Sequence, residues 1–250
     1  MKPDPADNAK ARMKEEFQIV IPFNVYSASA VSAARRYVTL VAEQISQAHA
    51  NDRIEALQQY RELSNPDEAD YDLYVGSVDR CYEDDFRPML YFTSVVYLYM
   101  IFETYVLRHA AEIHPYTAGK RKTLITNIKG GLVKAAQKYF EDDIGIRFFS
   151  ESQWTQLQEI AHVRNCIVHD SGIPRNSDKN RESIYKLEKR IWRNQPVGLH
   201  IDWHQGSDLG CPMNLNQRFL EYCLNLLEEF FNSLGTAAEE KFKQQVQKNP

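Results

Sequence analysis

The chain of 250 residues has few of the residues that interrupt or cross-link a fold, with 10 glycines, 10 prolines and 4 cysteines. Since breakers are scarce and no stretch is of low complexity, the sequence marks no clear domain boundary or linker. The cysteines are far apart and form no CxxC pair, and Cys166 and Cys223 fall inside helical patterns. They are expected to be reduced structural residues, and neither a metal site nor a cofactor is predicted.

Long apolar runs are missing as well. The longest, VVYLYMIF at residues 95–102, is too short to cross a bilayer, and the N-terminal MKPDPADNAK has no apolar segment of the signal-peptide type. A cytoplasmic protein with no membrane association is therefore expected. Positive charge is not in excess either, because the net charge is −4. The whole molecule has no general attraction for nucleic acid, so any such binding needs a local basic patch.

Helical periodicity dominates the rest of the chain. Apolar side chains recur at steps of three and four residues over 31–48 and again from about Asn214 to Leu234. A further short helix is predicted over 53–63, ending before Asn65-Pro66, because a residue that precedes proline disfavours helix. A long apolar helix is predicted over 85–113, with Asp84 or Asp85 as its N-cap.

One more helix is predicted to begin at Ser150, where Gln153 completes a capping box, and to end at Asp170-Ser171-Gly172. Residues 173–214 are the least regular, and the alternation in VGLHIDWHQG predicts one short hairpin. Together these elements predict an all-α antiparallel helical bundle with a small irregular or hairpin insertion. N-terminal helices within 1–84 are expected to pack on a core of residues 85–234, followed by a polar, frayed tail at 235–250.

Polar residues gather at the end of the helix that begins at Ser150, in HVRNCIVHDSG at residues 162–172. Helical spacing places Arg164 on the apolar face, which it shares with Leu157, Ile160, Ala161, Ile167 and Val168. A guanidinium cannot lose its charge to escape burial, so Arg164 needs an acid partner or a polar cleft. The best acid is Glu103, which is carried by the most apolar helix.

Two interpretations of this arrangement are open. In a structural one, Arg164 and Glu103 form a buried pair that fixes helix register, and His169 sits at a helix C-terminus where the dipole favours its charged form. In a functional one, Arg164 and His169 face a cleft, where the arginine binds a phosphate and the histidine moves a proton. Spacing alone favours the structural interpretation.

The stretch Arg164-Asn165-Cys166-Ile167-Val168-His169 resembles the signature of the HEPN superfamily, in which an arginine and a histidine are separated by four to six residues at a helix end. Members are all-helical, and many are metal-independent ribonucleases that act as dimers, often as toxins or antiviral effectors. The resemblance implies that His169 acts as general acid or base on the ribose 2′-hydroxyl and that Arg164 stabilises the phosphate. It also implies that Asn165 orients the substrate or the histidine, while Glu103 and His162 are expected to support the site.

The resemblance further implies a homodimer, an RNA substrate, and an antitoxin or other protein partner. On an ideal helix Arg164 and His169 are about 140° apart, so one copy does not stack them, whereas a two-fold axis could gather both pairs around one phosphate. Ser171 stands where one toxin branch has a tyrosine that a partner enzyme modifies, so that regulation is not implied. The family also contains non-catalytic dimerisation and nucleotide-binding modules, and the two motif residues alone do not separate these classes.

Two further groups of residues are weaker candidates. The segment 120–138 is basic and contains no acid, and it could guide an RNA backbone if it flanked Arg164; its first residues are Lys120, Arg121, Lys122 and Lys129. A solvated helix face is the simpler interpretation. His200, Asp202 and His204 would share one face of a strand, yet no thiol or further histidine is close in sequence, so exposed hairpin residues are expected there and not a metal site.

Overall fold

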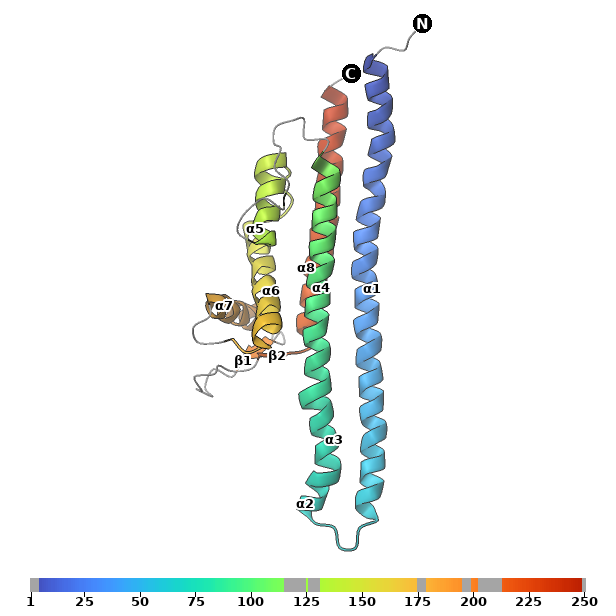
Figure 1. The fold of residues 1–250 in the computed structure, drawn as a ribbon, viewed down its shortest axis with the longest axis vertical. Coiled ribbons are helices and arrows are strands. Elements are labelled where there is room, and N and C mark those ends of the chain that lie inside the picture. The colour runs from blue at the N-terminus through green and yellow to red at the C-terminus, as the bar shows by residue number, and fades with distance from the viewer. Residues whose placement is uncertain are drawn as a thin grey trace. The chain divides into compact units, whose positions relative to one another are not determined.

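The computed structural model describes residues 5–114, 125, 131–174, 179–194, 199–201 and 213–248. Over these residues the protein is all-α apart from one two-stranded ribbon, which confirms the predicted fold class (Figure 1). The larger helices are α1 (Pro5–Arg61), α4 (Arg87–Ile113), α5 (Leu132–Gln137), α6 (Glu151–Asp170), α7 (Lys179–Asn194) and α8 (Gln217–Lys248). Between α1 and α4 lie α2 (Glu68–Tyr71), η1 (Asp72–Gly76), α3 (Ser77–Arg80) and η2 (Cys81–Phe86), of which η1 and η2 are π-helical.

Contacts divide the chain into two units that share four helices. The first unit contains Met1–Ser32, Leu98–His162 and Cys223–Pro250, and the second contains Ala33–Tyr97 and Val163–Tyr222. The chain passes between the units inside α1, α4, α6 and α8.

The core of the first unit is an aromatic cluster centred on Phe230 of α8. Its ring meets Phe102, Phe149 and Trp154 edge-on, with centroids 5.2 to 5.5 Å apart. Edge-to-face pairs of this kind add about 0.5–1.5 kcal/mol each to the gain from burial. Trp154 is fixed further because its Nε1 donates to Oε1 of Glu141 at 2.8 Å. Residues from α4, α6 and α8 therefore form one core.

The N-terminus of α6 has the predicted capping box. Oγ of Ser150 accepts from the backbone N–H of Gln153 at 3.3 Å, and Oε1 of Gln153 accepts from the N–H of Ser150 at 2.8 Å. Each side chain satisfies a backbone donor that the helix leaves without an internal partner. The capping box is thus confirmed.

The second unit contains a helical hairpin, in which the C-terminal part of α1 runs antiparallel to the segment that begins with α2 (Figure 1). The two pieces predicted over 31–48 and 53–63 are one helix, α1, which ends at Arg61. The predicted break at Asn65-Pro66 is confirmed, and Asn65 adopts a positive φ of 64° there.

The prediction that the following helix begins at Asp84 or Asp85 is wrong. Helical structure begins at Glu68, after a capping box in which the Asp67 carboxylate accepts from the Asp70 N–H at 2.9 Å and the Asp70 carboxylate accepts from the Asp67 N–H at 3.2 Å. From there it runs without interruption to Ile113. Pro88 lies inside this run and cannot donate to a preceding carbonyl, and the π-helical η2 ends just before it.

The predicted hairpin is only half right. Strand β1 (Leu199–Ile201) lies in the expected stretch, but it pairs antiparallel with β2 (Met213–Leu215), with Leu199 opposite Leu215. Leu199, Met213 and Leu215 are all buried, so burial of apolar residues that are distant in sequence sets the pairing.

Helix α8 begins at Gln217 and continues through most of the stretch that was expected to be frayed, ending at Lys248. Leu234 and Ala238 are buried and continue its apolar face, and an ion pair between Glu239 and Lys243 supports its exposed face. The polar composition of 235–250 hides this periodicity, because its few apolar residues are spaced a full turn apart.

Candidate functional site

The motif residues Arg164, Asn165 and His169 all lie on α6, in the part of the helix that belongs to the second unit. The apolar face predicted for this helix is right in its first turns, where Leu157, Ile160 and Ala161 are buried.

The predicted face is wrong in the last turns of α6. There Val163 and Cys166 are fully buried, whereas the side chain of Val168 is 48% exposed and Ile167 is half-buried. A step of three residues from Ile160 to Val163 is as compatible with a helix as a step of four to Arg164, and the sequence alone does not choose between them. Arg164 consequently lies at the edge of the buried face and not in its centre.

Arg164 is half-buried, and its Nη1 donates to Oδ1 of Asn165 at 3.0 Å. The amide of Asn165 thus holds the guanidinium next to it. The resemblance implied that Asn165 orients the substrate or the histidine, but its observed contact is with the arginine.

His169 is exposed in the last turn of α6. Ser171 and Gly172 follow with positive φ angles of 53° and 77°, which end the helix where the sequence predicted. The N–H of Gly172 donates to the carbonyl of Cys166 at 3.1 Å, and the carbonyl of Gly172 accepts from the N–H of Met213 at 2.9 Å. Strand β2 therefore holds the helix end that carries His169.

The other predicted site residues lie apart from this group or outside the described residues. His162 is half-buried, with Nε2 3.1 Å from Nε2 of Gln158. Glu103 is half-buried on α4 in the first unit, and its support of Arg164 stays a prediction. Lys120, Arg121, Lys122, Lys129, Asp202 and His204 lie outside the described residues, as does the side chain of His200 in β1.

Across the described ranges, no group of three or more histidine, cysteine, aspartate or glutamate side chains could hold a metal ion. Cys81, Cys166 and Cys223 form no disulfide among the described residues, and burial raises the pKa of Cys223. A thiol that is hard to ionise is a poor nucleophile, so Cys223 serves packing.

The helical run Glu68–Ile113 is long and apolar enough to cross a membrane by length and composition. The core helix of a soluble protein meets the same criterion, and 44% of the most apolar 18-residue part of this run is buried inside the protein. Phe102 and Val106, for example, are fully buried. The run is therefore weak evidence for a membrane segment.

A second polar cluster, which the sequence analysis missed, joins the two arms of the helical hairpin. Nε2 of His49 lies 2.8 Å from Oδ1 of Asp79, Nδ1 of His49 lies 3.7 Å from Glu83, and Nε of Arg53 donates to the same Asp79 oxygen at 3.2 Å. The His49 ring stacks on Tyr82 at a centroid distance of 4.8 Å. No sequence signal links these residues, because they are about thirty positions apart on different helices.

Hydrogen bonds shift the pKa values of two side chains in and beside this cluster, Asp79 and Tyr82. Burial raises the pKa of Asp79, but the hydrogen bonds and charges of His49 and Arg53 outweigh it, so the pKa lies below 3.8. A hydrogen bond to the Asp52 carboxylate, 2.5 Å from the Tyr82 hydroxyl, raises the pKa of Tyr82 to about 12. Both arrangements favour the protonation states that hold the hairpin together.

Comparison of the chain with models of protein families, with curated proteins and with solved structures gave no match. A functional proposal for this chain consequently rests on its own residues and their geometry.

Proposed function

We propose that the chain is a HEPN-type, metal-independent endoribonuclease that acts as a homodimer, with Arg164 and His169 of each copy at its centre. One observation carries the proposal: α6 ends with a half-buried Arg164 held by Asn165 and an exposed His169 just before the helix breaks. The arginine is preoriented, and the histidine is accessible to a substrate. These are the two properties that an anion-binding group and a proton-transfer group need.

In this mechanism His169 removes the proton from a ribose 2′-hydroxyl, and the oxygen attacks the adjacent phosphorus. The bond from phosphorus to the 5′ oxygen then breaks, and the departing oxygen takes up a proton from a protonated histidine. Arg164 stabilises the additional negative charge on the phosphate oxygens as it develops. The products carry a 2′,3′-cyclic phosphate and a 5′-hydroxyl.

A second copy of the chain allows an arginine and a histidine to reach the same phosphate, which the two residues of one helix cannot do. Because Arg164 and His169 are five positions apart, their directions from the helix axis differ by about 140°. A two-fold axis near the end of α6 brings the arginine of one copy toward the histidine of its partner, so that one phosphate meets both. In this arrangement one histidine acts as base and the other as acid.

The remaining assignments follow from the same proposal. Asn165 positions Arg164, while Glu103 and His162 support the site. The basic residues Lys120, Arg121, Lys122 and Lys129 guide the RNA backbone, and a toxin or antiviral defence system, with an antitoxin or other protein partner in the cytoplasm, is the setting in which such an activity is used.

The experiment is cleavage of labelled single-stranded and structured RNA in EDTA by the wild-type chain, by His169→Ala and by Arg164→Ala. The matched control is Ser152→Ala, an exposed position on the same helix. Wild type and control should produce cyclic phosphate ends, and both motif variants should not. Cleavage that persists in an Arg164→Ala/His169→Ala double variant, or no cleavage by an intact wild-type dimer on varied RNAs, would contradict the proposal.

Stability measurements of the same variants separate a loss of catalysis from a loss of folding, and calorimetry tests the alternative of a non-catalytic module that binds nucleotides. His169 is exposed, so His169→Ala should leave the melting temperature nearly unchanged. Arg164→Ala removes a half-buried hydrogen-bonded group and should cost on the order of 1–3 kcal/mol. Titration calorimetry with nucleotides tests the nucleotide-binding alternative directly.

A further inference from the structure

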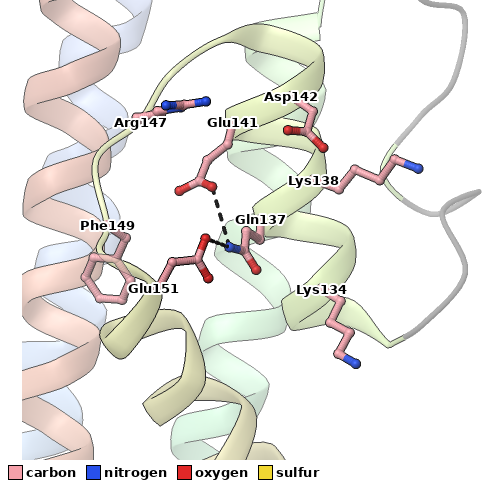
Figure 2. A pocket seen from close by; sticks show the side chains of 8 residues that line it. All are labelled: Lys134, Gln137, Lys138, Glu141, Asp142, Arg147, Phe149 and Glu151. Atoms are coloured by element: carbon pink, nitrogen blue, oxygen red, sulfur yellow. Dashed lines mark hydrogen bonds between the residues drawn. The ribbon is translucent and has the colours of Figure 1, made fainter.

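A hollow of about 640 Å³ opens in the first unit, between the helical segment that begins with α5 and the chain that leads into α6 (Figure 2). Its charged lining is balanced, with Glu141, Asp142 and Glu151 as acids and Lys134, Lys138 and Arg147 as bases. Gln137 and Phe149 complete the wall. Its volume is typical of pockets that bind small molecules, which measure about 300–1,000 Å³.

Local structure explains why these side chains converge. Helix α5 continues as the π-helical η5 (Lys138–Ile144), and the chain then reverses at Gly145, whose φ is 74°. The N–H of Ile146 donates to the carbonyl of Phe140 at 2.7 Å, which closes the turn. Phe149 is anchored in the aromatic core, so the returning segment is held beside the helix. Figure 2 shows Arg147 and Phe149 on this returning segment and the two lysines on the helix.

Two carboxylates converge on one amide at the centre of the hollow. Nε2 of Gln137 lies 3.1 Å from Oε1 of Glu151 and 3.5 Å from Oε2 of Glu141, as the dashed lines in Figure 2 show. The other Glu141 oxygen accepts from Trp154, which fixes this carboxylate in place. A group with several N–H donors fits between the two acids better than a single amide, because each carboxylate accepts up to four hydrogen bonds.

The bases of the hollow do not neutralise these acids directly. Within the part of the chain that the structure describes, no ion pair or hydrogen bond engages the guanidinium of Arg147 or the ammonium groups of Lys134 and Lys138. Opposite charges therefore face the same space without touching. Glu141 and Glu151 would repel a purely anionic ligand, and Arg147 would repel a purely cationic one.

We propose that this hollow binds a small zwitterion of the free amino acid or short peptide class. The ligand ammonium takes the place of the Gln137 amide between Glu141 and Glu151, and the ligand carboxylate binds the guanidinium of Arg147, which can form two parallel hydrogen bonds. Phe149 offers an apolar surface to the ligand's carbon skeleton. This inference concerns the first unit and does not depend on the proposed nuclease activity.

The test is titration calorimetry of the full chain with free α-amino acids and glycylglycine, each beside its N-acetylated and its amidated form. Saturable binding is expected for the zwitterions, weakened by about tenfold or more when either end is blocked, as loss of one charge-assisted contact implies. Glu151→Gln should act like the blocked amine and Arg147→Gln like the blocked carboxylate. Glu240→Gln, at an exposed position on α8, is the matched control and should bind as wild type does.

Pairing variants with blocked ligands makes the test specific. Glu151→Gln should cause no further loss for N-acetylated ligands, because the group it recognises is already gone. Circular dichroism of each variant checks that it is folded. Absence of binding by every probe at millimolar concentrations, equal binding of blocked and free forms, or equal binding by folded variants and wild type would each overturn the proposal. No RNA is present, so these outcomes are separate from the failure of the nuclease proposal.

Discussion

Gly172 lies directly against the ring of Phe92: a Cβ atom added to Gly172 would be 2.5 Å from Cε2 of that ring. Real Cβ atoms do not approach a neighbour so closely, and the φ of 77° is also one that residues with a side chain rarely adopt. The same residue bonds through its backbone to Cys166 and Met213. Three positions after His169, a glycine thus joins α4, α6 and β2.

Gly172→Ala is therefore expected to destabilise the protein by on the order of 3 kcal/mol, which combines about 1–2 kcal/mol for the positive φ with the displacement of Phe92. Urea unfolding followed by circular dichroism measures this loss. If the nuclease proposal holds, the variant should also lose RNA cleavage, because the end of α6 shifts.

The control is Gly131→Ala, which separates the two costs. Gly131 has a φ of 87°, yet among the described residues nothing beyond its own chain neighbours lies within 4 Å of an added Cβ. It should lose only about 1–2 kcal/mol, the cost of the backbone conformation. Equal losses in the two variants would mean that the contact with Phe92 contributes nothing.

Signals within a few residues allowed the ends of α6 to be predicted. Ser150 and Gln153 cap the helix through contacts three residues apart, and Gly172 supplies a conformation that follows from its own lack of a side chain. Features of this kind can be read from sequence because the interacting groups are neighbours in the chain. The all-α class is predictable for the same reason.

Features that depend on distant residues could not be predicted. The start at Glu68 is an exception, because the capping box of Asp67 with Asp70 is a local signal that the prediction of Asp84 or Asp85 overlooked. Val163, and not Arg164, lies on the buried face of α6, and this choice depends on residues from other parts of the chain that pack against the helix. The hollow beside Glu141 and Glu151 depends on a chain reversal at Gly145, whose geometry the sequence does not specify.

The pair formed by His49 and Asp79 predicts a loss of stability in acid. Because the pKa of Asp79 in the folded protein is below 3.8, its contribution is complete above about pH 4 and is lost as the pH falls through the folded value. Asp79→Asn keeps the shape and removes the charge. It should cost about 1 kcal/mol at neutral pH, because Asp79 and Arg53 are 37% and 43% exposed and solvent screens them.

Urea unfolding as a function of pH checks this expectation. Asp79→Asn should also flatten the stability curve below about pH 4, where wild type loses the contribution. Asp85→Asn, an exposed aspartate on the neighbouring η2, is the control and should keep the wild-type slope. A variant at position 79 that is as stable as wild type at neutral pH would show that the cluster does not hold the hairpin.

His109 predicts a second pH dependence, in a different window. Its ring is buried beside Phe231, with Nε2 3.3 Å from Oγ of Ser27, and burial followed by the charge of Arg108 lowers its pKa from 6.5 to about 4. The unfolded chain binds a proton near pH 6.5 whereas the folded protein stays neutral, so stability falls as the pH drops from about 6.5 to about 4. The loss is at most about 3 kcal/mol.

His109→Leu should remove this slope, because leucine fills the buried site and does not titrate. His169→Ala is the control, because it leaves the buried His109 in place and the slope between pH 4 and 6.5 should remain. A wild-type slope retained in His109→Leu would mean that another group titrates in this window. Since Asp79 acts below about pH 4 and His109 above it, the two substitutions flatten separate parts of the curve, one for each unit.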